Sequence, residues 1–224
     1  MRLRWFGQSA FLLEDGAGSK IAIDPFGDLS AATGGKMRFD YPAVDGVEAD
    51  LLLITHEHRD HNDADRIGGE PHVIRSTAGR FETPFGEVVG VASEHDAVAG
   101  TERGGNTIFC FRVDDFAICH FGDFGQTALR PEQRAAIGEV DILLLPVGGG
   151  PTTGGAAAAA IVEELAPSLV VPMHYRTDAI DFLEPPDAFL AALPGWQIDR
   201  LETSELTVDS LGDPRVTLLA APSA

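Results

Sequence analysis

The sequence predicts an α/β layered domain made of two similar strand-rich halves, roughly residues 1–100 and 101–224, packed face to face around one core. Several apolar runs of four or five residues have the length and continuity of strands buried on both faces. Helix-forming segments lie between these runs, and this alternation is typical of α/β layers. No linker rich in Pro, Gly or Ser divides the chain, so one domain over residues 1–224 is expected.

An internal similarity supports the two halves. In the first half, "SKIAIDPFGD" (19–28) is an apolar strand that runs into a Gly-Asp turn, and "DFAICHFGDFG" (115–125) repeats the pattern in the second half. Likewise, "ADLLLITH" (49–56) and "VDILLLPVG" (140–148) each have an Asp, an apolar run and a break. A strand is therefore predicted in each of these segments.

Three helices are predicted between the strands. "NDADRIGG" (62–69) has an Asn or Asp cap and ends at Gly. "GGAAAAAIVEELAP" (154–167) is rich in Ala, Thr153 can cap its start, and Pro167 lies just past its end. The third helix is "PPDAFLAALPG" (185–195). Two further strands are predicted at 168–175 and 215–221.

Composition limits the class of protein. The apolar fraction of 44% suits a globular chain, and no apolar run approaches the ~20 residues that span a bilayer. The N-terminal segment lacks the continuous apolar stretch and cleavage site of a signal peptide, so the expected location is the cytoplasm. With 16 basic and 35 acidic residues the net charge is −19, which disfavours a nucleic-acid partner. No membrane partner is expected, and the oligomeric state stays open.

The two cysteines are too few for a disulfide scaffold. "FCFRVDDFAIC" (109–119) predicts two strands joined by a two-residue turn at Asp114 and Asp115. Such a turn places Cys110 opposite Cys119, and we expect two reduced thiols on adjacent strands.

The segment "LLLITHEHRDHND" (51–63) ends a predicted strand with four potential metal ligands, His56, His58, Asp60 and His61. Three of the seven histidines of the chain lie here. In a helix, residues two positions apart project about 200° apart, so His56 and His58 would diverge, whereas they can converge in a turn after a strand. Imidazole and carboxylate together suit zinc, manganese or iron.

Three more candidate ligands follow the ends of other predicted strands. They are His95 in "ASEHDA", Asp123 in "CHFGDFG" and His174 in "VPMHY". Because sites on α/β layers lie at strand ends, we expect these side chains to meet those of residues 56–61 at one edge of the fold.

The segment "HEHRDH" (56–61) matches an H-x-H-x-D-H signature, and with it the chain resembles the metallo-β-lactamase-fold hydrolases. Four further motifs of that family match in order along the whole chain, at Asp24 in "IAIDPF", His95, Asp123 and His174. The phrases "RGGNTIF", "PVGGGPTTGGAAA" and "VPMHY" resemble the subgroup that includes ascorbate-6-phosphate lactonase-like proteins.

The resemblance implies an αββα four-layer sandwich with two divalent metal ions, zinc first and manganese or iron as alternatives. It assigns His56, His58 and His95 to one ion. It assigns Asp60, His61 and His174 to the other ion, with Asp123 between the two. Ions ~3.5–4 Å apart would share a hydroxide that attacks a carbonyl or phosphoryl centre. Asp60 is the catalytic candidate, because its carboxylate could orient that hydroxide or take its proton.

Three residues are candidates for a supporting role. The resemblance places Asp24 where it would hydrogen-bond a ligand loop. His120 could support the site or pack beside Phe121, and Tyr175 could contact a substrate oxygen or simply be packed. The loop 148–155 precedes a helix, so its amides could bind an anion, and an anionic small-molecule substrate is one expectation.

The predicted reaction is metal-dependent hydrolysis of a small ester, lactone or phosphodiester. Three alternatives stay open: a nuclease or RNA-processing phosphodiesterase, an iron-dependent sulfur dioxygenase, and a non-catalytic metal-binding relative. The acidic composition weighs against the first, because RNA-binding surfaces are basic. The full ligand set weighs against the last, and the fold alone does not identify a substrate.

Overall fold

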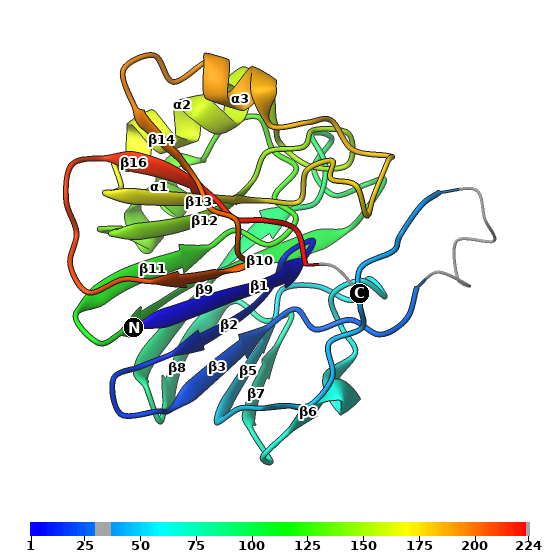
Figure 1. Ribbon diagram of the computed structural model, residues 1–224, viewed down its shortest axis with the longest axis vertical. Coiled ribbons are helices and arrows are strands. Elements are labelled where there is room, and N and C mark those ends of the chain that lie inside the picture. The colour runs from blue at the N-terminus through cyan, green and yellow to red at the C-terminus, as the bar shows by residue number, and fades with distance from the viewer. Residues whose placement is uncertain (30–36, 223–224) are drawn as a thin grey trace.

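Two β-sheets packed face to face form the body of the protein (Figure 1). The structure is a computed structural model that describes residues 1–29 and 37–222. The first sheet consists, in spatial order, of β15 (Glu205–Thr207), β1 (Arg2–Gly7), β2 (Ala10–Glu14), β3 (Lys20–Ile23), β5 (Leu51–Ile54) and β7 (His72–Arg75). The second consists of β14 (Gln197–Arg200), β16 (Arg215–Leu218), β13 (Leu169–Met173), β12 (Ile142–Pro146), β11 (Phe116–His120), β10 (Gly105–Val113), β9 (Gly86–Glu94) and β8 (Gly79–Thr83). One apolar core fills the space between them.

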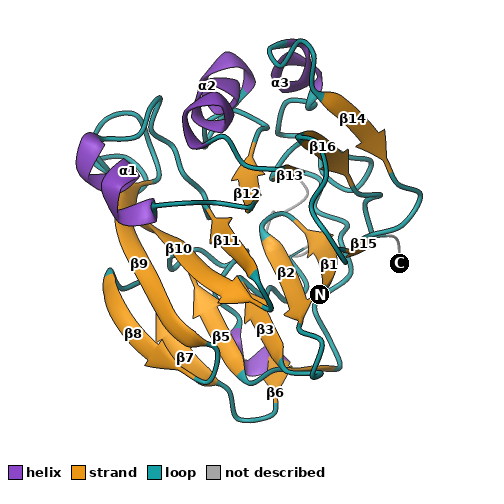
Figure 2. Ribbon diagram, turned by 90° about the vertical axis from the view of Figure 1, so that its left-hand side faces the viewer, coloured by secondary structure: helices purple, strands orange, loops and turns teal. Residues whose placement is uncertain are grey.

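The outer faces of the two sheets are covered in different ways. Helices α1 (Pro131–Ile137), α2 (Gly155–Leu165) and α3 (Asp187–Ala191) cover the second sheet (Figure 2). The first sheet is covered by irregular chain carrying Phe26 and Phe39, by a small parallel pair β4 (Val47–Glu48) and β6 (Ile67–Gly68), and by the 3-10 turn η1 (Ala64–Arg66). The predicted αββα sandwich is therefore confirmed, with few helices and an outer layer on the first sheet made mostly of loops.

The predicted internal similarity is visible in the strand pairing. In the first sheet β3 and β5 are parallel neighbours, with Ile21 opposite Leu51. In the second sheet β11 and β12 are parallel neighbours in the same way, with Ile118 opposite Ile142. The sheets do not divide at residue 100, however, because β9 pairs with β10 over a long antiparallel ladder and β15 returns to the first sheet.

Two of the predicted helices differ in detail. Segment 62–69 forms the short turn η1 and the strand β6 rather than a longer helix, because Ile67 pairs with Val47 and the Asp63 carboxylate bonds Arg66 without capping a helix. Helix 154–167 is present as α2, but Gly154 stands at its cap position, and no side chain caps it. Helix α1 was not predicted, although a proline at its first position was an available signal.

The other predicted elements are present. Segment 185–195 contains α3, 168–175 contains β13, and 215–221 contains β16. Among the described residues, no helix has the length and apolarity needed to cross a bilayer.

The hairpin between β10 and β11 has the predicted register, with Cys110 opposite Cys119 across the turn at Asp114. The two Sγ atoms lie 3.3 Å apart and both thiols are free. Cys119 is fully buried, and this burial, together with the contact to Cys110, raises the pKa of its thiol well above the usual value.

We expect iodoacetamide at pH 8 to alkylate Cys119 in the folded protein at a rate far below that of a free thiol, because the thiolate is the reacting form and the side chain is inaccessible. Mass spectrometry of peptides after labelling with and without denaturant measures this rate. Labelling of Cys119 at equal rates in both conditions, or a disulfide in protein purified without oxidant, would contradict the expectation.

Candidate metal centre

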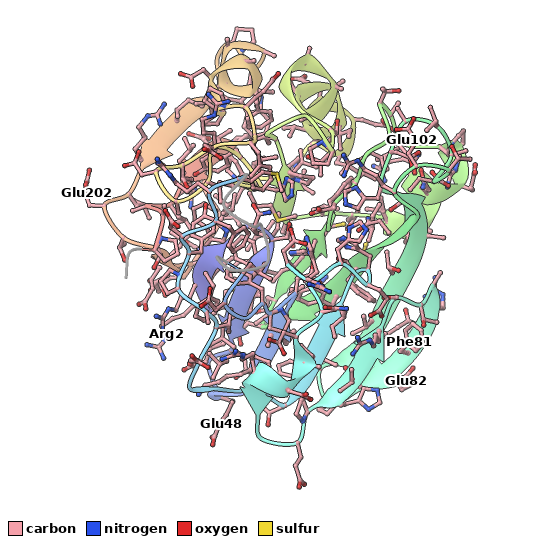
Figure 3. All side chains as sticks on the ribbon, turned by 90° about the vertical axis from the view of Figure 1, so that its right-hand side faces the viewer. Arg2, Glu48, Phe81, Glu82, Glu102 and Glu202 are labelled. Atoms are coloured by element: carbon pink, nitrogen blue, oxygen red, sulfur yellow. The ribbon has the colours of Figure 1, made fainter. Side chains whose placement is uncertain are left out.

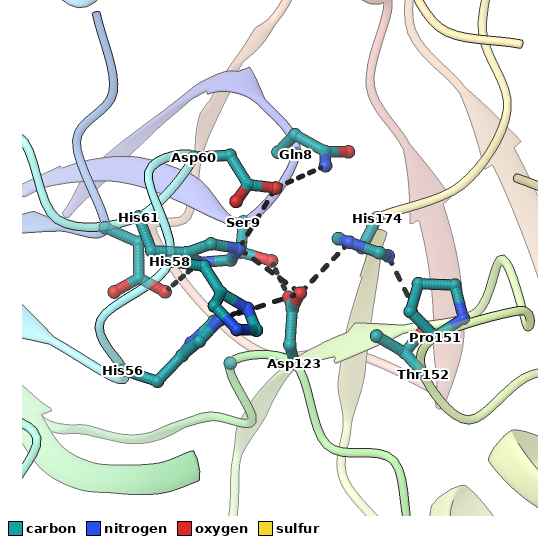
Figure 4. Close-up of polar contacts among 12 residues, drawn as sticks. Gln8, Ser9, His56, His58, Asp60, His61, Asp123, Pro151, Thr152 and His174 are labelled. Carbon is teal, nitrogen blue, oxygen red and sulfur yellow. Dashed lines mark hydrogen bonds and ion pairs between the residues drawn. The ribbon is translucent and has the colours of Figure 1, made fainter. Parts of the chain in front are cut away.

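The structure brings all seven predicted ligands together where four loops meet at one edge of the sheets. They form two groups, and within each group the candidate ligand atoms lie within 4.8 Å of one another. One group is His56, His58 and His95, and the other is Asp60, His61, Asp123 and His174. Six of the seven are labelled in Figure 4. Strand β5 precedes the loop 56–61, β11 precedes Asp123, β13 precedes His174, and His95 directly follows β9.

The carboxylate of Asp123 lies at the centre of the cluster. Its Oδ2 atom is 3.1 Å from Nε2 of His95, 3.1 Å from Nε2 of His174 and 3.2 Å from Nε2 of His61. Nε2 of His56 is 4.0 Å away from the same oxygen. Asp123 therefore lies beside members of both ligand groups.

The Nδ1 atoms of two of these imidazoles face hydrogen-bond acceptors. Nδ1 of His95 lies 3.0 Å from the carbonyl oxygen of Pro151, and Nδ1 of His61 lies 2.9 Å from a carboxylate oxygen of Asp24. A carbonyl oxygen can only accept, so the proton of a neutral His95 is on Nδ1. In the neutral form of both rings, Nε2 then carries a lone pair that faces the cluster.

The same pattern holds for the other two imidazoles. Nδ1 of His56 lies 3.0 Å from Oγ1 of Thr55, whose own proton goes to Asp24. Nδ1 of His174 lies 3.4 Å from Oγ1 of Thr152, which donates to backbone carbonyls. Such partners fix the tautomer and the ring orientation of histidines that bind metals.

These groups fit a divalent metal ion. Nε2 of His61 is buried and has no hydrogen-bond partner within the described part of the chain, although it lies 3.2 Å from a carboxylate oxygen. At that distance the two groups attract each other only when a positive charge lies between them, either a proton on Nε2 or a metal ion. Two ligand atoms ~2.0–2.1 Å from a tetrahedral zinc ion are about 3.3 Å apart, close to the observed separations.

Burial and charge shift the pKa values in the cluster. Burial, together with the neighbouring His61, lowers the pKa of His56 to about 2. Burial opposes ionisation of Asp123, but His174 and His61 outweigh it and hold the pKa well below its usual value. Burial also opposes protonation of His61, and there the carboxylates of Asp123, Asp60 and Asp24 raise the pKa well above normal. The Asp123 carboxylate is thus ionised, and a neighbouring cation stabilises its negative charge.

Asp24 hydrogen-bonds the segment that carries the ligand loop. It is fully buried and accepts hydrogen bonds from the backbone N–H of Thr55 at 2.8 Å, the Thr55 hydroxyl at 2.7 Å and Nδ1 of His61. Its backbone is left-handed, with φ of 49°. One carboxylate therefore orients His61 directly and His56 through Thr55.

Two supporting residues were not predicted. Gln8 is fully buried, and its side-chain Nε2 donates to Asp60 at 3.1 Å. Its backbone carbonyl oxygen accepts a hydrogen bond from the backbone N–H of His174. Ser9 donates its hydroxyl proton to Asp123 at 3.0 Å. The available signal was a polar pair directly after the apolar strand "LRWFG", at the same edge as the ligands.

His120 and Tyr175, the other two candidates for supporting roles, differ in what they contact. His120 accepts the N–H of Gly122 at Nδ1, and its Nε2 lies 2.9 Å from the Ser9 carbonyl, so it steadies the segment that holds Asp123. The Tyr175 ring stacks on Trp5 and its hydroxyl is directed to a backbone carbonyl of Leu219, which favours the packing role.

Two glycines allow the ligand loops to approach closely. A Cβ atom at Gly125 would lie 2.4 Å from the backbone of His95, and one at Gly148 would lie 2.3 Å from the carbonyl oxygen of His174. Any side chain at these positions would push a ligand loop outward.

A pocket of about 260 Å³ opens above the cluster. Its floor includes His58, Asp60, His95, Asp123 and His174. The ligand groups are therefore accessible to a small molecule through this pocket.

Comparison with known proteins places this site in a family. Residues 2–174 match the family model of the β-lactamase superfamily domain. The chain belongs to the metallo-β-lactamase superfamily. It is 35% identical over 205 residues to a UPF0173 metal-dependent hydrolase of Thermococcus kodakarensis, with 79% of this chain and 85% of that protein covered. It is also 34% identical over 203 residues to a UPF0173 metal-dependent hydrolase of Thermus thermophilus, with 79% and 84% covered.

A solved structure agrees with these relatives. A crystal structure of a metallo-β-lactamase superfamily protein from Thermotoga maritima matches with a TM-score of 0.78 and 30% identity over 97% of both chains. The chain is thus a UPF0173-type metal-dependent hydrolase, and the more specific resemblance to ascorbate-6-phosphate lactonase-like proteins stays a prediction.

We expect Asp123→Ala to lose nearly all bound metal while the fold persists, because the carboxylate that faces both ligand groups is removed. Elemental mass spectrometry measures the metal content, and circular dichroism checks the fold. Asp115→Asn, at the exposed turn of the hairpin, is the matched control. Full metal content in the Asp123 variant would show that the site assignment is wrong.

Asp24→Asn should weaken metal binding about 10–100-fold, because Asn keeps the size but not the charge that orients His61. Asn also tolerates the left-handed backbone at this position, so the fold should be retained. Competition with a chromogenic chelator measures the affinity, and an unchanged dissociation constant would exclude the supporting role.

Proposed function

We propose that this UPF0173 protein hydrolyses a small ester, lactone or phosphodiester with two divalent ions, zinc before manganese or iron. His56, His58 and His95 would hold one ion. Asp60, His61 and His174 would hold the other, and Asp123 would contact both. The observation that carries the proposal is the set of imidazole Nε2 atoms turned toward one carboxylate oxygen at the floor of an open pocket.

Bound divalent ions supply Lewis-acid polarisation of the scissile bond and activation of the attacking water. The residues of the chain position the reaction around them. Asp60 lines the pocket, and Gln8 fixes its carboxylate through a 3.1 Å hydrogen bond. We assign Asp60 the orientation of the attacking water, and transfer of its proton as a secondary role.

The structure of the pocket supports a small substrate. Its volume of about 260 Å³ is below the ~300 Å³ lower bound that is typical of sites for drug-sized ligands. The lactonase-like alternative within the resemblance fits this size, as do simple esters and phosphodiesters. The cytoplasmic location and the exclusion of nucleic acid remain expectations from the sequence.

The first experiment is metal analysis of protein purified without chelator or affinity metal, followed by a substrate panel. We expect about two equivalents of metal per chain, and metal-dependent turnover of a 4-nitrophenyl ester, a lactone or bis(4-nitrophenyl) phosphate. One equivalent would exclude the binuclear site and favour the dioxygenase alternative. Rapid metal-dependent cleavage of RNA at physiological salt would overturn the small-molecule assignment.

Asp60→Asn tests the role of the carboxylate in the reaction. We expect kcat to fall about 10²–10⁴-fold on whichever substrate the wild type hydrolyses, because a positioned acid–base group contributes that much. Asp65→Asn, an exposed residue just beyond the ligand loop, is the control and should keep full activity. Unchanged turnover in the Asp60 variant would exclude the proposed role.

A further inference from the structure

Two arginine side chains line the pocket without an acidic partner. Arg59 and Arg103 are exposed at its mouth, and within residues 1–29 and 37–222 neither forms an ion pair at 4.0 Å or less. Of the twelve other arginines, eight form such an ion pair, and three more, Arg112, Arg134 and Arg176, donate to backbone carbonyl oxygens.

Other arginines of the chain illustrate the contrast. Arg75 pairs with Glu57, Arg66 with Asp45, and Arg130 with Glu94. Acidic side chains mostly lie at the periphery, and Glu102, next to Arg103 in sequence, is exposed on the outer part of its loop (Figure 3). The two pocket arginines are therefore left free to bind an external anion.

Arg59 is placed by the metal-ligand loop itself. Its neighbours His58 and Asp60 both face the cluster, while Glu57 faces away and accepts a bidentate pair of hydrogen bonds from Arg75 at 2.8 and 2.7 Å. Glu57 thus ties the loop to the end of β7, and the Arg59 side chain is left lining the pocket.

Arg103 is placed by a second ligand loop. The carboxylate of Asp96, the residue after His95, accepts four backbone N–H groups of this loop, including that of Arg103 at 2.9 Å. The backbone N–H of His95 also donates to Gly104 at 3.0 Å. Because these bonds join the loop to the segment that carries His95, the position of Arg103 is fixed relative to the metal centre.

The remaining wall of the pocket is apolar. Leu29, Met37, Phe39, Pro151 and Phe182 line it, and Met37 is 46% exposed. Phe39 is fixed by a backbone bridge to Ile180. The pocket thus combines a floor of candidate metal ligands, a cationic rim and an apolar wall.

We infer that Arg59 and Arg103 bind an anionic group of the substrate, a carboxylate or a phosphate, while its apolar part contacts the wall formed by Leu29, Met37, Phe39 and Phe182. This inference rests on the proposed function for the position of the scissile bond over the metal centre. The guanidinium fork matches the two oxygens of a carboxylate or phosphate, and the cations also attract an anion toward a molecule that is otherwise acidic.

The test is isothermal titration calorimetry of the metal-loaded full chain with three unreactive probes. 4-Phenylbutyrate carries a carboxylate, phenylphosphonate carries a phosphate-like group, and 4-phenylbutanamide is neutral. Arg59→Gln and Arg103→Gln should each weaken binding of an anionic probe about tenfold, and the double variant about a hundredfold. The amide should change less than twofold, and metal content, measured on each sample, should not change.

Arg80→Gln is the matched control, because it removes the same charge from the outer strand β8, where Arg80 pairs with Glu87. It should leave all three affinities unchanged, while Arg59→Lys should keep most of the anion affinity. A larger effect on one anionic probe identifies which anion the rim prefers.

Three outcomes would overturn the inference. The double variant could bind both anions with wild-type affinity, the wild type could bind neither anion, or the substitutions could weaken binding of the amide as much as that of the anions. Arginine-dependent anion binding in a protein that hydrolyses none of the panel substrates would instead reject the proposed hydrolysis and leave the anion site standing. The two failures are thus distinguishable.

Discussion

The contact on which the site depends is the approach of several imidazole nitrogens to one carboxylate oxygen, Oδ2 of Asp123. Unless a proton or a metal ion lies between them, this arrangement brings lone pairs together in a largely buried place. It persists because each ring is held from behind, by Asp24, by the Pro151 carbonyl or by a threonine hydroxyl. The loops, the close glycine contacts and the buried carboxylate below the site all serve to hold this geometry.

The sequence predicted the parts of the fold that depend on local pattern. Apolar strands followed from runs such as residues 51–54 and 142–146, because these are buried on both faces. Segment 62–69 had caps for a helix but became a turn and a short strand, since pairing of Ile67 with Val47 outweighed local propensity. The boundary between sheets was also missed, because strand partners far apart in sequence decide it.

The site shows the same division between local and tertiary information. The ligands were predictable because a chemical signature fixes their spacing along the chain. Gln8 and Ser9 were not, since their roles depend on which strand ends meet in space. Arg59 lay inside the signature at a variable position, and only the pocket and the pairing of Glu57 with Arg75 distinguish it from a solvated side chain.

The ligands are spread over four loops, and this spacing has a consequence for how the protein is made. Synthesis proceeds from the N-terminus, so the histidines of loop 56–61 leave the ribosome long before His174 exists. A nascent chain therefore offers an incomplete and flexible set of ligands, which binds metal weakly and with little selectivity. Stable loading must wait until both sheets have formed and closed on each other, which makes metal acquisition one of the last events in the maturation of this protein.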